Sequence, residues 1–215
     1  MLIVGAKGFA KDVLETLYQL NQNDNIVFFD NVNHDIPDLL YQKFKVLKSL
    51  EEVKIFFDKT DKKFTIGIGD PALRKKLADT FTDMGGVLIS TISVSANIGS
   101  YGVEIGDGSN VLSQVIISND VSVGKGTILY FNVILTHDVK VGNFVEISPG
   151  AILLGRCVVG NYSQIGSHAT ILPDIKIGAN VIVAAGAVVT ENVPDNCMVA
   201  GVPAVIKKQL NSLTF

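Results

Sequence analysis

A histidine and an aspartate stand side by side in the segment Leu135-Thr136-His137-Asp138-Val139. An imidazole exchanges a proton near neutral pH more readily than other side chains, which makes histidine a common general base in enzymes. A nearby carboxylate can bind one ring nitrogen and so fix which nitrogen is free to act. The pair indicates proton-transfer chemistry, and the alternative is a solvated histidine in an exposed turn.

A second group of residues indicates phosphate binding. The segment Gly5-Ala6-Lys7-Gly8-Phe9-Ala10 follows an apolar run and opens a predicted helix, and the free amide groups of a helix start favour phosphate. Its spacing is G-x-x-G-x-A, which a plain tight turn explains equally well. Asp30 ends the next apolar run, where an acid meets a ribose or base in dinucleotide-binding domains. Gly69, Asp70 and Arg74 extend the same predicted strand-end face.

The elements that carry this second group alternate between strands and helices over residues 1–87. We predict strands at 2–4, 26–29, 64–68 and 87–92, with residues 31–44 irregular. Helices are predicted at 8–20, after the capping residue Ser49, and after Asp70, where Pro71 takes the first helical position. This order favours a small α/β domain of the Rossmann-like βαβ type with a parallel sheet.

The elements that carry His137 follow a different rhythm. Every sixth residue from Ile105 to Val189 is Ile, Leu or Val, a period that fits neither an amphipathic helix nor an alternating strand. Glycine follows this aliphatic residue at every eighteenth position, at 106, 124, 142, 160 and 178. Three hexads therefore make one triangular turn of a parallel β-helix, and we expect glycine where the bend is tight.

The stretch Val133–Gly142, VILTHDVKVG, resembles the catalytic His-Asp segment of hexapeptide-repeat sugar acyltransferases. This family includes sialic acid O-acetyltransferases and nucleotide-amino-sugar N-acetyltransferases. The resemblance covers the whole chain and implies two domains: a sugar-nucleotide-binding domain at 1–87, and a left-handed β-helix acyltransferase domain at 88–215 with a C-terminal cap. It also implies a homotrimer.

The resemblance assigns roles to the candidate residues. It makes His137 the general base and Asp138 the carboxylate that orients it. Acyl-CoA would run along the prism wall between two subunits, near Gly155, Ala185, Gly186, Gly201 and Lys207. The sugar nucleotide would contact Gly5, Lys7, Gly8, Phe9, Asp30 and Glu146. Phe9, Tyr130 and Glu146 replace residues common in relatives (His, Asn and a second His), so the identity of the sugar stays open.

The function implied is an acetyl-CoA-dependent acetyltransferase acting on the amine of a nucleotide-linked amino sugar. O-acetylation of a sialic acid or related sugar is the nearest alternative. A metalloenzyme similar to γ-type carbonic anhydrases needs three histidine ligands, and the chain has only His34, His137 and His168. A non-catalytic scaffold would keep the repeats but lose the His-Asp pair.

Composition excludes several other classes. The chain of 215 residues has 18 Lys and Arg against 21 Asp and Glu, so no basic excess indicates nucleic-acid binding. No run approaches the roughly 18 apolar residues that span a membrane. The N-terminus has no charged region of the signal-peptide type, so we expect a cytoplasmic protein. Cys157 is expected to be a buried thiol, and we expect no bound metal.

Overall fold

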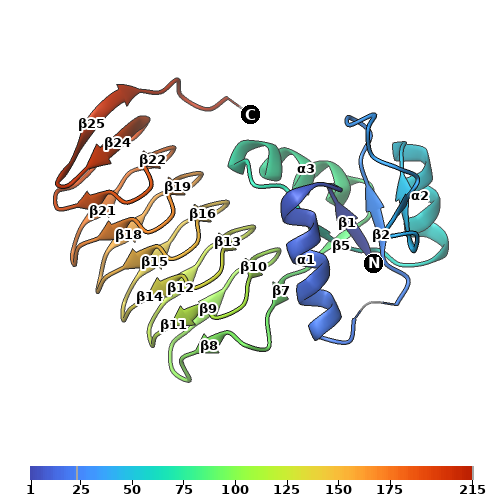
Figure 1. Cartoon of the computed structure of the whole chain (residues 1–215), viewed down its shortest axis with the longest axis horizontal. Coiled ribbons are helices and arrows are strands. Elements are labelled where there is room, and N and C mark those ends of the chain that lie inside the picture. Colours follow the sequence, from blue (N-terminus) through green and yellow to red (C-terminus); the bar gives the residue numbers. More distant parts are fainter. Residues whose placement is uncertain (23, 215) are drawn as a thin grey trace.

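The computed structural model describes residues 1–22 and 24–214, which form an α/β domain followed by a triangular prism of parallel strands (Figure 1). The α/β domain has a six-stranded sheet in the order β3-β4-β2-β1-β5-β6, in which β3 alone pairs antiparallel. Its elements are β1 (Leu2–Val4), α1 (Gly8–Gln19), β2 (Val27–Phe29), β3 (Leu39–Leu40), β4 (Phe44–Leu47), α2 (Leu50–Lys59), β5 (Lys63–Ile66), α3 (Pro71–Asp83) and β6 (Val87–Leu88).

Helices cover both faces of this sheet. The apolar side of α1 packs with Ile3, Phe28 and Val46 on one face, while α2 and α3 pack with Leu2, Val4 and their neighbours on the other. This alternation follows from the pleat of the strands, which sends successive side chains to opposite faces.

Local signals start the helices as the sequence predicts. The Ser49 side chain accepts a hydrogen bond from the Glu52 amide at 3.2 Å, and the Glu52 carboxylate accepts one from the Ser49 amide at 3.2 Å. Asp70 accepts one from the Leu73 amide at 2.7 Å, with Pro71 in the first helical position. The predicted caps of α2 and α3 are therefore confirmed.

The predicted strand at 87–92 is wrong, and the segment 31–44, which we expect to be irregular, contains β3 and the start of β4. The strand expected over residues 87–92 is two short strands, because β6 pairs with β5 while Thr91–Ile92 turns away to begin the prism. Residues 44–47 form β4, a parallel strand beside β2 that the sequence does not predict. This strand is only four residues long, and Lys45 interrupts its apolar run, so its pattern carries little signal.

The prism has three faces of parallel strands, and its axis carries a continuous aliphatic core. The first face comprises β7 (Thr91–Ile92), β10 (Asn110–Val111), β13 (Ile128–Leu129), β16 (Glu146–Ile147), β19 (Gln164–Ile165), β22 (Ile182–Val183), β24 (Cys197–Gly201) and β25 (Ala204–Gln209). The second face comprises β8 (Asn97–Ile98), β11 (Ile116–Ile117), β14 (Ile134–Leu135), β17 (Ile152–Leu153), β20 (Thr170–Ile171) and β23 (Val188–Val189). The third face comprises β9 (Glu104–Ile105), β12 (Ser122–Val123), β15 (Lys140–Val141), β18 (Val158–Val159) and β21 (Lys176–Ile177).

The sixth-residue aliphatics point into this core, as the period predicts, and the fold is a left-handed β-helix that follows an α/β domain. Cys157 is fully buried among them, and burial raises the pKa of its thiol to about 12, so the expected buried thiol is confirmed. The last two strands, β24 and β25, form an antiparallel hairpin that extends the first face at its C-terminal end.

The repeated glycines serve a different purpose from the one we expect. The left-handed backbone at this corner falls two residues later, at Gly108, Gly126, Phe144, Tyr162 and Asn180. A Cβ on Gly160 would instead lie 2.5 Å from the carbonyl carbon of Gly178, in the next coil. Close stacking of successive coils therefore excludes a side chain at these positions.

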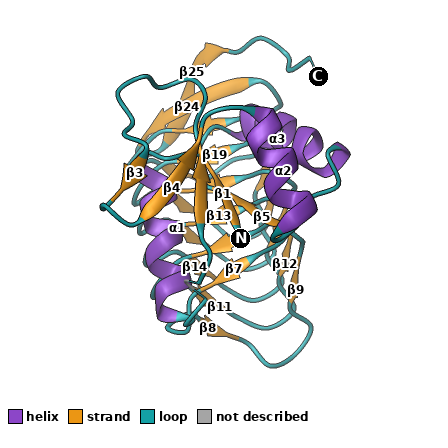
Figure 2. Cartoon of the chain, turned by 90° about the vertical axis from the view of Figure 1, so that its right-hand side faces the viewer, coloured by secondary structure: helices purple, strands orange, loops and turns teal. Residues whose placement is uncertain are grey.

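The first face of the prism packs against the α/β domain (Figure 2). Leu112 and Ile128 join the apolar cluster beneath α1, and Phe144 joins the cluster on the other side of the sheet. The buried amide of Asn110 donates to the Ile66 carbonyl at 3.3 Å and accepts from the Thr65 hydroxyl at 3.2 Å. These contacts hold the edge of the sheet where β5 ends against the prism.

Within the described ranges, the chain has no helix of the length and apolarity needed to cross a membrane.

Gly160→Ala should lower the free energy of unfolding by about 1–3 kcal/mol, because the new methyl group meets backbone of the next coil that cannot rotate away. Gly8→Ala is the matched control, since a Cβ there meets nothing within 4 Å. Denaturant unfolding of both variants tests this prediction. Equal stability of the two would contradict the stacking explanation.

Candidate active site

His137 and Asp138 lie in the turn between β14 and β15, at the edge where the second and third faces meet. Imidazole Nδ1 is 2.7 Å from Asp138 Oδ2. Two neighbours in a strand would point apart, but Asp138 has a left-handed backbone with φ of 61°, which allows the two side chains to meet. The side chains are 57% and 52% exposed, so the pair is open to a ligand.

The pairing determines what the imidazole can do. When Asp138 is ionised, its carboxylate only accepts hydrogen bonds, so Nδ1 keeps its hydrogen and donates a hydrogen bond to Asp138 Oδ2. In the neutral ring, Nε2 then keeps its lone pair and can accept a proton from a nucleophile.

The next coil forms a platform for this ring. Gly155 lies one full turn after His137, and a Cβ placed on it would be 2.6 Å from imidazole Cε1 and 2.8 Å from Nε2. The amide of Arg156 donates to the His137 carbonyl at 3.2 Å, which fixes the register of the two coils. Only glycine therefore lets the imidazole take this position.

The predicted phosphate-binding residues gather at the carboxyl ends of β1, β2 and β5. A cavity of about 320 Å³ opens there, and its lining includes Gly5, Lys7, Gly8, Phe9 and Asp30. A Cβ on Gly5 would be 2.9 Å from the Gly67 carbonyl oxygen, so glycine is required for this close approach. Lys7 is the N-cap of α1 and makes no side-chain cap, which leaves the amides of the helix start available.

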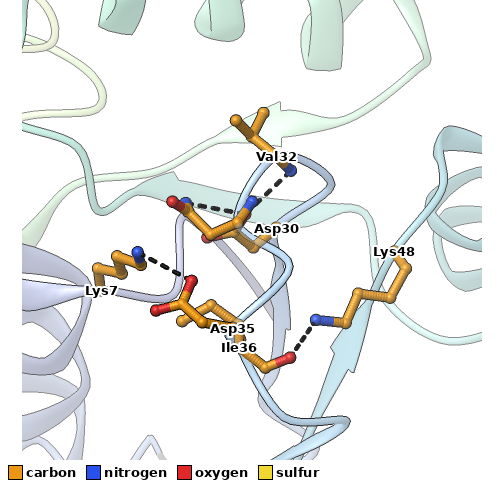
Figure 3. A network of polar contacts seen from close by, with 7 residues as sticks. Lys7, Asp30, Val32, Asp35, Ile36 and Lys48 are labelled. Carbon is orange, nitrogen blue, oxygen red and sulfur yellow. Dashed lines mark hydrogen bonds and ion pairs between the residues drawn. The ribbon is translucent and has the colours of Figure 1, made fainter.

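The loop after β2 is held by a network of polar contacts around this cavity (Figure 3). Asp30 Oδ1 accepts from the amides of Val32 and Asn33 at 3.1 and 2.9 Å, and the Asn33 side-chain amide contacts both carboxylate oxygens. Lys7 pairs with Asp35 at 3.1 Å. Asp30 therefore orders its own loop. The sequence does not predict the contact with Asn33, although an Asp after a strand is a signal for a turn in which it accepts from the amide two residues on.

A second cluster lies beside the cavity, where α1 meets the first face of the prism. The rings of Phe9 and Tyr130 are 5.0 Å apart between centroids. Glu146 projects from β16 toward Gly69, where an added Cβ would be 3.3 Å from its carboxylate. Burial raises the pKa of Glu146, and the nearby guanidinium of Arg74 partly opposes this rise. The sequence gives no signal that these residues meet.

The sequence predicts Arg74 on the same strand-end face as Gly69 and Asp70, and this prediction is wrong. Its side chain is 1% exposed and is directed under the loop that follows β5. Its guanidinium therefore cannot contact a nucleotide in the cavity.

The candidate CoA residues occupy different edges of the prism. Gly155 shares the edge of His137, whereas Ala185 and Gly186 lie in the turn between β22 and β23, where the first and second faces meet. Gly201 ends β24 and Lys207 lies in β25, so both belong to the C-terminal hairpin. The second face separates Gly155 from Ala185 and Gly186.

The two halves of the candidate site are also apart within one chain. The cavity and Glu146 adjoin the first face, while His137 lies on the opposite edge of the triangular section, between the other two faces. A ligand bound at the cavity of one chain therefore faces away from the imidazole of the same chain.

Two family models match the chain. Residues 1–81 match the PglD N-terminal domain, and residues 138–173 and 156–191 match the bacterial transferase hexapeptide repeats.

Solved structures similar to the whole chain carry the same two parts. Perosamine N-acetyltransferase from Caulobacter crescentus, crystallised as a histidine-substituted variant with CoA and GDP-perosamine, is 30% identical with a TM-score of 0.88, covering 97% of this chain and 96% of that one. The acetyltransferase domain of PglB from Neisseria gonorrhoeae, solved with acetyl coenzyme A, is 27% identical (TM-score 0.85; 96% and 98% covered). WeeI from Acinetobacter baumannii is 27% identical (TM-score 0.86; 96% and 98% covered).

A curated relative shares a shorter segment. Galactoside O-acetyltransferase from Lactococcus lactis is 39% identical over 44 residues, which spans 20% of this chain and 21% of that enzyme.

The α/β domain, the left-handed β-helix and the exposed His-Asp pair together define an acyltransferase of the hexapeptide-repeat class. The chain belongs to the hexapeptide-repeat sugar acyltransferases that carry a PglD-type N-terminal domain, as its sequence predicts.

Gly155→Ala should lower turnover by about 10²-fold, because the methyl group displaces the imidazole that we propose below as the general base. Steady-state kinetics of acyl transfer measure the loss. In a His137→Ala background, with acetyl-CoA saturating, the same substitution should cost no further turnover. An equal loss in both backgrounds would mean that Gly155 acts on something other than this ring.

Proposed function

We propose that this protein is an acetyl-CoA-dependent N-acetyltransferase whose acceptor is the amine of a nucleotide-linked amino sugar. The observation that carries this proposal is the His137–Asp138 pair on an open edge of the prism, with Nε2 free to accept a proton. The similarity over nearly the whole chain to perosamine N-acetyltransferase, crystallised with CoA and GDP-perosamine, supports the nature of both substrates.

The reaction would be a direct transfer. His137 Nε2 accepts a proton from the sugar amine as the amine nitrogen attacks the thioester carbonyl. The C–N bond forms, the C–S bond of the tetrahedral intermediate breaks, and the imidazolium returns its proton to the departing CoA thiolate. Asp138 keeps Nδ1 protonated and stabilises the positive charge on the ring between these two steps.

The sugar nucleotide would bind at the carboxyl ends of β1, β2 and β5. Its phosphates would meet the amides at the start of α1, with Gly5, Lys7 and Gly8 around them, and its ribose or base would lie near Asp30. The sugar would extend toward Phe9 and Glu146, at the boundary with the prism. Phe9, Tyr130 and Glu146 stand where other residues are common in relatives. This difference supports an acceptor sugar different from those of the relatives.

The active site would be shared between two subunits of a homotrimer. Since the cavity and His137 lie on opposite sides of one chain, the imidazole of a neighbouring subunit must supply the base. Acetyl-CoA would lie between two prism walls, with Gly155 from one and Ala185 and Gly186 from the other, and Gly201 and Lys207 near its far end. The cytoplasm, where nucleotide sugars and acetyl-CoA are made, suits this reaction.

O-acetylation is the second candidate function. The short match to a galactoside O-acetyltransferase favours a hydroxyl acceptor, and the same base would serve it. Thiol release from acetyl-CoA with nucleotide amino sugars, nucleotide sugars without the amine, and sialic acids separates the two. Activity with only the hydroxyl acceptors would refute N-acetylation.

His137→Ala should leave the fold intact and reduce turnover by about 10²–10⁴-fold, since the side chain is exposed and acts as the base. Asp138→Asn should cost less, because it disturbs the orientation of the ring without removing it. His168→Asn, at another exposed turn, is the control and should retain activity. Full activity of folded His137→Ala would remove this residue from the mechanism.

The protein should be a trimer with three times the chain mass of 23.0 kDa. Light scattering at micromolar concentration measures this mass. A stable monomer that retains full activity would contradict the shared site.

A further inference from the structure

Arg74 is a fully buried cation at the boundary between the two domains. It lies in the first turn of α3, and its side chain is 1% exposed. Removing a charge from water is costly, so buried arginines are normally paired with a carboxylate.

The guanidinium of Arg74 is instead surrounded by neutral carbonyl groups. Nε donates to the Gly126 carbonyl at 2.9 Å, and Nη2 donates to the carbonyls of Phe144 and Val145 at 2.9 and 3.0 Å. Nη1 donates to the carbonyls of Ile68 and Gly69. One side chain therefore ties two successive coils of the prism to the loop that lines the cavity.

Two of these hydrogen bonds bring Arg74 close to Glu146, because Val145 directly precedes Glu146 in the chain and Gly69 lies beside the Glu146 carboxylate. Burial lowers the pKa of Arg74, and the charge of Glu146 opposes this change. Burial raises the pKa of Glu146, and the charge of Arg74 opposes that change in turn. Among the described residues no hydrogen bond or ion pair engages the Glu146 carboxylate, which faces Gly69 beside the cavity. Asp70 is already engaged, because it accepts from the Leu73 amide.

We propose that Arg74 is a positioning residue for the acceptor sugar: it keeps Glu146 ionised and holds the Gly69 loop against that carboxylate. This inference rests on the proposed function, in which Glu146 contacts the acceptor. An ionised Glu146 accepts hydrogen bonds from sugar amine or hydroxyl groups, whereas a protonated one would also compete as a donor. Arg74 thus acts on the acceptor without touching it.

Other groups around Glu146 make the direction of the effect clear. Asp70 raises the pKa of Glu146, as burial does, and the charges of Glu146 and Asp12 in turn raise the pKa of Tyr130. Arg74 is the cation that opposes these influences. Loss of its charge should therefore raise the pKa of Glu146. As the pH is lowered, Glu146 would then become protonated, and acceptor binding would weaken, at a higher pH than in the parent protein.

The test compares two substitutions in the full chain. Arg74→Gln removes the charge, while Arg74→Lys keeps the charge but loses the planar fork that spans both domains. Lys76→Gln removes a charge from an exposed residue of α3 two positions further on and is the control. Titration of side-chain carboxyl carbons by NMR, with Glu146→Gln to assign the signal, reads the ionisation of Glu146 without any substrate.

In Arg74→Gln the titration midpoint of Glu146 should rise, while Arg74→Lys and Lys76→Gln stay near the parent. An unchanged midpoint in folded Arg74→Gln overturns the inference.

If Arg74→Gln does not fold, the kinetics of Arg74→Lys test the inference instead. In that variant the acceptor KM should rise several-fold with the acetyl-CoA KM unchanged. An unchanged acceptor KM in that variant also overturns it. Absence of turnover in the parent would refute the proposed function and leave the titration result standing.

Discussion

The pairing of each coil with the next at a spacing of eighteen residues is the constraint on which the rest of the structure depends. It brings Gly155 under His137 and Asp138 into a left-handed turn beside the imidazole. It also presents the carbonyls of Phe144 and Val145 to Arg74, which fixes the α/β domain on the first face. A rigid stack therefore positions an imidazole that lies on an exposed turn, where loops alone would leave it mobile.

The same geometry separates the parts of the site. One chain carries a cavity of about 320 Å³ on one side of the prism and the imidazole on the opposite edge. A three-fold arrangement of such prisms would bring the cavity side of one chain toward the edge of another. Oligomerisation would then be part of the proposed catalytic mechanism, because the proposed site would be incomplete in an isolated subunit.

Much of this could be predicted from the sequence, and the limits have physical causes. The aliphatic residues at every sixth position predict the prism because each strand and corner of the coil takes six residues. The caps at Ser49 and Asp70 are predictable because they depend only on residues next to them in the chain. The contact between Glu146 and Gly69, and the burial of Arg74, depend on how two domains pack, which no local pattern encodes. The strand at 44–47 is missed because pairing with β2, rather than its own pattern, stabilises it.

The most direct test of the shared site is complementation between two inactive variants. His137→Ala removes the base, and Gly8→Glu places a negative charge at the start of α1, where a Cβ meets no atom within 4 Å and the fold should persist. With random mixing in a trimer, about a quarter of the interfaces join an intact cavity to an intact imidazole. Co-expressed variants should therefore regain about a quarter of the parent activity, although each alone is nearly inactive. Mixed trimers with no recovered activity would show that both groups act within one chain and would contradict this account.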